Sequence, residues 1–165
     1  MREAGPAGVA LAGFMAVGKS TIGRRLAVRL ELPFVDLDEA IVAQEGRSIP
    51  DLFADGGELA FREAERRALG TVLAGGPQVL ALGGGTIHHF DNLERLRAVL
   101  PVVVLDAPWS VIAARLGHGS GRPLAGEARA LWEARRAVDL AAGTVVDVGH
   151  DPPDVAVERV LAVLA

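Results

Sequence analysis

The chain has 165 residues, of which half are hydrophobic, and carries a formal net charge of −4 at pH 7. This length fits one domain with a buried core, the hydrophobic share excludes a disordered chain, and the negative charge argues against nucleic acid as the main partner. No apolar run is long enough to span a bilayer, and cysteine is absent, which excludes disulfides and thiolate metal sites. We therefore expect a cytoplasmic monomer with no membrane or nucleic-acid partner.

Short apolar runs alternate with longer amphipathic stretches, which is typical of βαβ units with a parallel sheet. The apolar runs predict five strands, at 9–12, 34–37, 79–82, 102–105 and 144–148. The amphipathic stretches predict helices near 20–32, 38–45, 58–73, 90–99, 108–116, 129–141 and 153–164. The predicted fold is α/β: a three-layer αβα sandwich around a five-stranded parallel sheet.

The first predicted strand leads into the glycine-rich segment GFMAVGKST at 13–21, and a predicted helix follows it. The segment fits the phosphate-binding pattern G-x-x-x-x-G-K-[ST], and its Lys19 is the only lysine in the chain. A slim ammonium on a flexible stem can reach back over a loop whose N–H groups surround phosphates, whereas a guanidinium has the wrong shape. Ser20 would place its hydroxyl on Mg²⁺. Strand, loop and helix together predict a nucleotide-binding site.

Two carboxylates, Asp36 and Asp38, stand at the end of the second predicted strand, on either side of Leu37. Alternation along a strand sends residues two apart to the same side, so both could face the crevice at the carboxyl ends of the strands. One carboxylate could hold Mg²⁺ directly or through water, and another could orient an attacking hydroxyl or take its proton. Asp38 could instead cap the helix that follows, and the residues leave both interpretations open.

Two features in the middle of the chain could face a ligand. Arg62 and Glu65 are three residues apart on a predicted helix, so a carboxylate could hold the guanidinium ready for an anionic substrate. Most such pairs on a helix surface have no such role. Gly83, Gly84 and Gly85 directly follow a predicted strand, and a turn without side chains lets the backbone approach a ligand closely. We favour ligand binding for this turn.

The segment 117–127, GHGSGRPLAGE, is rich in glycine, lacks periodicity and carries Arg122. Its composition favours a surface loop, and a mobile lid is the alternative. Arg122, together with Arg135 or Arg136 in the helix after it, could place positive charge over a moving phosphoryl group.

With these motifs in order, the chain resembles the shikimate kinases from about Val9 to Val148, with a matching final helix. The P-loop occurs in many nucleotide enzymes, so the resemblance rests mainly on an ordered set of further motifs. These are Asp36-Leu37-Asp38, Phe61-Arg62 with Glu65, Gly83-Gly84-Gly85 and Arg122-Pro123-Leu124. The resemblance implies transfer of the γ-phosphoryl group of ATP to the 3-hydroxyl of shikimate, with ATP and Mg²⁺ required, in aromatic amino-acid biosynthesis.

The resemblance also implies roles for individual residues. The catalytic residues would be Lys19, Asp38 and Arg122, with Asp38 as the base near the ring hydroxyls. The residues that bind ATP would be Ala16, Val17, Gly18, Lys19, Ser20, Thr21, Arg115 and Arg122. The residues that bind shikimate would be Asp38, Arg62, Gly83, Gly84, Gly85 and Arg135. Mg²⁺ would be held by Ser20 and, through water, Asp36. The five-stranded sheet would have the P-loop kinase topology, and residues 1–165 would form a single P-loop kinase domain with a lid around 117–128.

The chain departs from the family pattern in two places. A Pro-Leu-Tyr signature usually follows the second substrate-binding arginine, whereas here Arg135 precedes Arg136-Ala137-Val138-Asp139 and the chain has no tyrosine. The choice between Arg135 and Arg136 therefore stays open, and register favours Arg135. The stretch from Arg122 to Arg135 is also shorter than the family pattern, which suggests a trimmed lid.

Three other functions compete with this interpretation. Another small-molecule kinase, such as a gluconate kinase, fits the P-loop, but the two arginines and the triple glycine argue against it. A GTPase is excluded, because its Asn-Lys-x-Asp motif needs a second lysine. A regulatory ATPase could use Asp106 to hold Mg²⁺, but Pro108 follows closely and no catalytic glutamate comes after it.

His88 and His89 are adjacent in the sequence, so their side chains should point in different directions, and we predict no metal site there.

Overall fold

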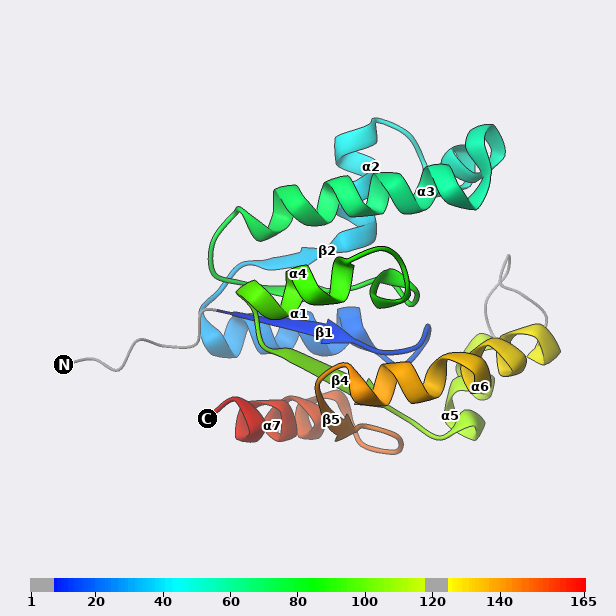
Figure 1. Cartoon of the computed structure of the whole chain (residues 1–165). Helices are drawn as coiled ribbons and strands as arrows, with labels where there is room; N and C mark the ends of the chain where they lie inside the picture. Colours follow the sequence, from blue (N-terminus) through cyan, green and yellow to red (C-terminus); the bar gives the residue numbers. More distant parts are fainter. Residues whose placement is uncertain (1–7, 118–124) are drawn as a thin grey trace.

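The structure is a computed structural model that describes residues 8–117 and 125–165. Strands and helices alternate along the chain (Figure 1). The strands are β1 (Gly8–Ala12), β2 (Phe34–Asp36), β3 (Gln78–Ala81), β4 (Val102–Asp106) and β5 (Thr144–Asp147). The helices are α1 (Lys19–Leu30), α2 (Leu37–Glu45), α3 (Ile49–Leu73), the 3-10 turn η1 (Thr86–His88), α4 (Asn92–Val99), α5 (Trp109–Leu116), α6 (Ala125–Ala141) and α7 (Pro153–Leu164). Within the described ranges, no helix is both long and apolar enough to cross a membrane.

The five strands form one parallel sheet in the order β2-β3-β1-β4-β5, so β1 is central. In β1, Leu11 pairs with Ala81 of β3 on one side and with Val103 of β4 on the other. The chain therefore crosses from one side of β1 to the other, which makes the carboxyl end of β1 the switch point where open α/β sheets bind ligands. All strands point the same way, so the loops that carry the sequence motifs gather at one edge of the sheet.

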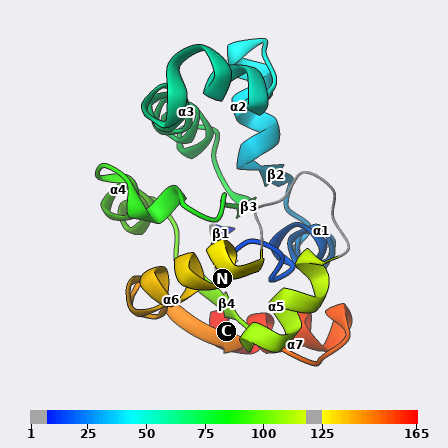
Figure 2. The same cartoon turned by 90° about the vertical axis from the view of Figure 1, so that its right-hand side faces the viewer.

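Alternate side chains of β1 enter two cores on opposite faces of the sheet. Val9 and Leu11 pack in a core covered by α1 and α7, and Ala10 and Ala12 pack in a core covered by α2, α3 and α4. Figure 2 shows α4 on one side of the strands and α1 and α7 on the other. The predicted three-layer αβα sandwich is confirmed. The central strands β3, β1 and β4 are buried on both faces, which explains why they read as continuous apolar runs, whereas the edge strand β2 is half-buried and β5 is mostly exposed.

The element boundaries correct the predictions at several points. Leu37 belongs to α2 and not to the second strand. The long helix α3 starts at Ile49 and not near 58, because the Ser48 side chain accepts the N–H of Asp51 and caps it. Gly57, with φ 70°, kinks this helix and separates its two parts. Helix α6 likewise starts at 125 and not at 129.

Candidate active site

The loop between β1 and α1 folds around the side chain of its lysine. Lys19 Nζ donates hydrogen bonds to the carbonyls of Gly13 (2.6 Å) and Phe14 (3.0 Å), so the ammonium lies back over the loop. Gly18, the residue before α1, has φ 109°, and Ala16 has the left-handed φ of 64°. A non-glycine residue in that region is strained, and such strain is common where a loop must aim several N–H groups at an anion. The N-terminus of α1 adds partial positive charge at the same point.

Burial sets the proton affinity of this lysine. Burial lowers the pKa of Lys19 from 10.5 to about 8, and the carboxylates of Asp38, Asp139 and Asp36 oppose the lowering. Lys19 is therefore mostly protonated at pH 7, but it binds its proton less tightly than an exposed lysine does. A phosphate at the loop would favour the charged form.

Arg115 on α5 closes one end of the loop. Its Nη1 donates to the carbonyls of Ala16 and Val17, both at 2.9 Å. The lining of the cavity beside this loop also includes Val148, on the connection between β5 and α7, and Pro153, at the start of α7.

Ser20 and Asp36 join the start of α1 to the end of β2. Ser20 Oγ donates to Asp36 Oδ2 (2.8 Å), while Asp36 Oδ1 accepts the N–H groups of Asp38 (2.9 Å) and Glu39 (3.2 Å). Asp36 and Asp38 both line the cavity, as predicted, but not through strand alternation, because β2 ends at Asp36 and Asp38 lies in the first turn of α2. The helix cap is Asp36, which leaves the Asp38 carboxylate free of the capping role and lining the cavity.

The hydroxyl of Ser20 and the carboxylate of Asp36 also fit a magnesium site. Mg²⁺ prefers hard oxygen ligands, and in nucleotide sites it is held by one or two protein oxygens together with phosphate oxygens. The 2.8 Å separation of Ser20 Oγ and Asp36 Oδ2 puts two such oxygens side by side in the wall of the cavity.

Asp38 occupies an environment that favours its neutral form. Burial raises the pKa of Asp38, and the nearby carboxylates of Asp36 and Glu65 raise it further, against the opposing charges of Lys19 and Arg62. A carboxylate with a raised pKa accepts a proton more readily than an ordinary aspartate, which suits a general base.

The triple glycine that follows β3 packs closely against two other parts of the site. A Cβ placed on Gly83 would lie 3.3 Å from Asp38 Oδ1, and one placed on Gly84 would lie 3.3 Å from the backbone N of Met15 in the P-loop. These contacts explain why side chains are absent here: the turn fills the space between the P-loop and α2.

Two guanidinium groups converge over the third glycine. A Cβ on Gly85 would lie 2.6 Å from Arg62 Nη2, which comes from α3, and 3.0 Å from Arg135 Nη2, which comes from α6. Arg135 Nη1 also donates to the carbonyl of Gly84 at 3.4 Å. Burial lowers the pKa of Arg135, and the charge of Arg62 lowers it further. An anion bound between two guanidinium groups this close would stabilise both. Each planar guanidinium can donate two parallel N–H hydrogen bonds to a carboxylate, so a carboxylate fits this place.

The buried carboxylate of Glu65 holds the Arg62 guanidinium in place. Arg62 Nη1 donates to Glu65 Oε1 at 3.0 Å, and the predicted pairing of the two residues is present. Glu65 is fully buried and also accepts the hydroxyl of Thr86 at 2.9 Å. A buried carboxylate needs such partners, so Glu65 fixes the guanidinium and the start of η1 together.

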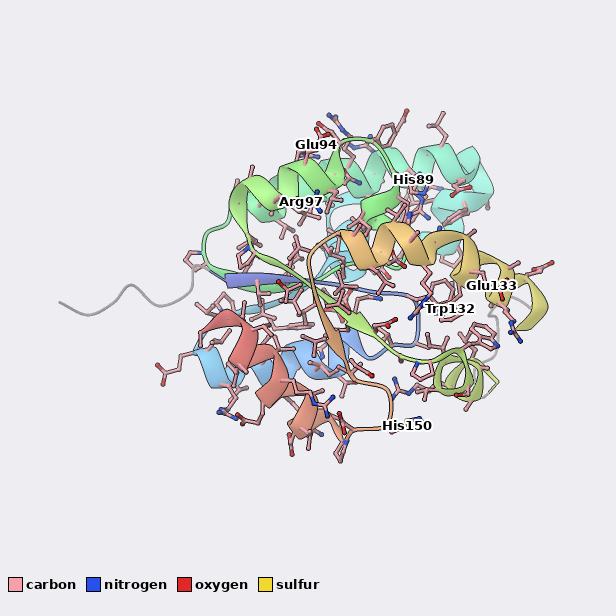
Figure 3. The ribbon with its side chains drawn as sticks, turned by 60° about the horizontal axis from the view of Figure 1, so that its bottom comes forward. His89, Glu94, Arg97, Trp132, Glu133 and His150 are labelled. Atoms are coloured by element: carbon pink, nitrogen blue, oxygen red, sulfur yellow. The ribbon has the colours of Figure 1, made fainter. Side chains whose placement is uncertain are left out.

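The adjacent arginines of α6 face different surroundings. Arg136 donates to both carboxylate oxygens of Asp106 (2.7 and 3.0 Å) and lies over the ring of Trp132. Trp132 in turn contacts Trp109 of α5, in the region between α5 and α6 (Figure 3). The Arg136 guanidinium is therefore bound to Asp106 and does not contact the glycine turn, whereas the Arg135 guanidinium lies against that turn. Asp106, the acidic residue of the ATPase alternative, is occupied by the same ion pair.

A cavity of about 620 Å³ lies at the switch point. Most predicted site residues line it, namely Ala16, Val17, Gly18, Lys19, Ser20, Thr21, Asp36, Asp38, Gly83, Gly84 and Arg115. Arg62, Gly85 and Arg135 are not part of this lining and form the adjacent cluster described above. Arg122, and with it most of the predicted lid, lies outside the described residues.

Several lining residues were not anticipated from the sequence. Val148 and Asp151 come from the connection after β5, and Pro153 from the start of α7. Met15 lies in the P-loop, and Leu82 directly follows β3. No motif marks the connection after β5. The signal that could have found it is topological, because every loop at the carboxyl end of a parallel strand opens on the same crevice.

The fold and the site define a P-loop phosphotransferase, in which a phosphate-binding loop lies beside a second cluster that carries a carboxylate and two guanidiniums. The family model for shikimate kinase matches residues 15–165. The chain belongs to the shikimate kinase family.

Named relatives and a solved structure agree with this assignment. The chain is 45% identical over 120 residues to a shikimate kinase of Bradyrhizobium diazoefficiens, a match that covers 73% of this chain and 58% of that protein. It is 39% identical over 162 residues to a shikimate kinase of Caulobacter vibrioides, covering 94% and 81%. The solved shikimate kinase of Acinetobacter baumannii, in complex with shikimate, superposes with a TM-score of 0.90 at 28% identity, covering 96% of this chain and 93% of that one.

Proposed function

We propose that this chain transfers the γ-phosphoryl group of ATP to the 3-hydroxyl of shikimate and so serves aromatic amino-acid biosynthesis. The observation that carries the proposal is the convergence of Arg62 and Arg135 over Gly85, beside the Asp38 carboxylate and the P-loop cavity. A small substrate with a carboxylate at one end and hydroxyls at the other is complementary to this arrangement. Membership of the shikimate kinase family supports the same substrate.

The reaction divides the work between the two clusters. Arg62 and Arg135 grip the carboxylate, while the backbone of the glycine turn at 83–85 lies against the ring. Asp38 accepts a hydrogen bond from the reacting hydroxyl and takes its proton as the oxygen bonds to the γ-phosphorus. The bond from that phosphorus to the bridging oxygen breaks, and ADP leaves. The raised pKa of Asp38 supports this role as base.

ATP occupies the P-loop side of the cavity. Its phosphates bind along residues 16–21, Lys19 neutralises charge on the transferring group, and Arg115 lies against the adenine. By the family pattern, Arg122 would act with Lys19 as the lid over 117–128 closes. We propose that residues 1–165 form one P-loop kinase domain.

Mg²⁺ belongs to the proposed site as well. Ser20 would hold it directly and Asp36 would hold it through water, as their adjacent oxygens suggest. When bound, the ion would neutralise charge on the phosphates. A cytoplasmic location, a monomeric state and the lack of nucleic-acid or membrane partners stay predictions.

An acceptor panel tests the proposal. ADP release is coupled to a spectrophotometric readout with ATP and Mg²⁺, and the acceptor is shikimate, gluconate or none. We expect rapid ADP release with shikimate only. Equal rates in all three reactions would show an ATPase, and faster release with gluconate would show the alternative sugar-acid kinase; either result overturns the proposal.

A further inference from the structure

Helix α6 carries Arg135, and its last turns are attached to several other elements. Arg97 of α4, labelled in Figure 3, donates to the carbonyls of Ala141 and Ala142 at 2.8–3.0 Å and so caps the end of the helix. Arg136 forms its ion pair with β4. These contacts tie α6 to α4 and to β4, and neither reaches the glycine turn.

A third contact does reach that turn. Asp139 lies one helical turn after Arg135, and its Oδ1 is 2.7 Å from Nε2 of His88. His88 is the last residue of η1, and its own N–H donates to the carbonyl of Gly85 at 3.1 Å. The side-chain pair therefore connects α6 directly to the turn over which the Arg135 guanidinium lies.

Arg135 has little else to hold it. Its hydrogen bond to the carbonyl of Gly84 is long, at 3.4 Å, and no carboxylate of the described residues lies within 4.0 Å of its guanidinium. Its position therefore depends on where α6 is placed relative to the turn. The side chains of His88 and Asp139 are only 13% and 10% exposed, so the pair costs desolvation that apolar residues would avoid. Such a pair is better suited to fixing a geometry than to adding stability.

The charge of Asp139 also reaches both halves of the site. Burial lowers the pKa of Lys19 and of Arg135, and in each case Asp139 opposes the lowering. Asp139 is thus a shared neighbour of the lysine at the phosphates and the arginine at the substrate, although it contacts neither.

We propose that His88 and Asp139 are positioning residues for the proposed phosphoryl transfer, and this inference rests on the proposed function. The pair sets the placement of α6 against the glycine turn and thereby holds Arg135 beside Arg62 for the substrate carboxylate. Asp139 is the last residue of the segment that replaces the Pro-Leu-Tyr pattern. In this chain, its contact with His88 anchors α6 at that position.

Three variants test the pair. His88→Ala removes it, His88→Gln keeps a side-chain N–H that can donate to Asp139, and Arg97→Met removes a different anchor of the same helix. We expect His88→Ala to raise the KM for shikimate about tenfold, with the KM for ATP within about twofold of the parent. His88→Gln should restore most of the loss. Arg97→Met should lower the melting temperature and leave the KM for shikimate unchanged.

A double-mutant cycle shows whether His88 acts through Arg135. If it does, His88→Ala adds little to the KM effect of Arg135→Ala, because the group that it positions is already gone. Full additivity of the two effects would overturn the inference. If His88→Ala fails to fold, Asp139→Leu, which is similar in size but cannot accept the hydrogen bond from His88, is measured in its place and carries the same expectation.

The outcomes separate this inference from the proposed function. Parent protein that does not phosphorylate shikimate contradicts the proposed function. Active parent protein, with a His88→Ala variant that loses thermal stability but keeps the parent KM for shikimate, contradicts the positioning role alone. An equal rise in the KM for shikimate in His88→Ala and Arg97→Met does so too, because it would reflect general loosening of α6.

Discussion

Lys19 is the only side chain of this protein that ordinarily titrates between about pH 8 and pH 11, because the chain has no cysteine, no tyrosine and no other lysine. Its ammonium is buried and donates to two carbonyls of its own loop. A labelled lysine Nζ would therefore give one resonance that reports on the phosphate site directly.

We predict that this resonance titrates with a midpoint near pH 8 in the absence of nucleotide, because burial lowers the pKa of Lys19 to about 8. Bound ATP should raise the midpoint, since phosphates favour the charged form. The affinity for ATP should accordingly fall as the pH rises above 8, where binding must first return a proton to Lys19. A midpoint near 10.5 in the free protein would contradict this account of the loop.

The role of Asp38 can be tested with one adjacent control. Asp38→Asn keeps the shape of the side chain and removes its basicity, so we expect kcat to fall about 10²–10⁴-fold while ATP binding persists. Glu39→Gln makes the same change at the neighbouring residue, whose side chain pairs with exposed Arg24. Steady-state kinetics of this control should match the parent. Near-parent turnover of Asp38→Asn would show that the base lies elsewhere.

Residues within a motif could be predicted from the sequence, and residues joined by packing could not. Lys19, Asp36, Asp38 and the first two glycines of the turn stand in recognisable patterns, and the structure brings them to one cavity. The contact between His88 and Asp139 joins residues 51 positions apart. Nothing local in the sequence marks such a pair, because it depends on how α6 packs against η1.

At the scale of elements, the glycine turn after β3 is the joint between the two clusters. Its first two glycines face α2 and the P-loop, and its third faces the two guanidiniums. Gly85 has φ −112°, which other residues adopt readily, so a substitution there acts through space and not through backbone strain.

We predict that Gly85→Ala raises the KM for shikimate more than tenfold, because the new methyl would lie 2.6 Å from Arg62 Nη2 and displace it. The KM for ATP should change little, since the P-loop contacts the turn at Gly84 instead. Kinetics with each substrate varied in turn measure the two constants. A larger effect on ATP than on shikimate would show that the turn belongs to the nucleotide half of the site.

Element boundaries were less predictable than element existence. All five strands were found: the three central ones are buried on both faces and appear as apolar runs, and the edge strands β2 and β5 carry shorter apolar runs. Asp38 was placed at the end of the second strand, although Asp36 with Glu39 three residues later is a helix-start pattern, and in the structure the cap at Asp36 starts α2 at once. The start of α3 was missed because the pair Gly56-Gly57 suggests a loop, whereas the helix continues across the kink at Gly57.

At the scale of the whole molecule, the order β2-β3-β1-β4-β5 is what brings the parts of the site together. β1 delivers the P-loop, β2 and β3 deliver the carboxylates and the glycine turn, and β4 and β5 lead to α5, α6 and the far wall of the cavity. The alternation of strands and helices predicted a parallel sheet, but the strand order could not be read from it. That order decides which loops become neighbours.

Phosphorus NMR of a reaction that contains this protein, ATP, Mg²⁺ and shikimate shows directly whether the 3-hydroxyl is phosphorylated. We predict that the γ-phosphate signal of ATP is replaced by one phosphomonoester signal, coupled to the proton on carbon 3 of shikimate, as ADP forms. Inorganic phosphate as the only new product, or a phosphomonoester on another hydroxyl, would contradict this prediction.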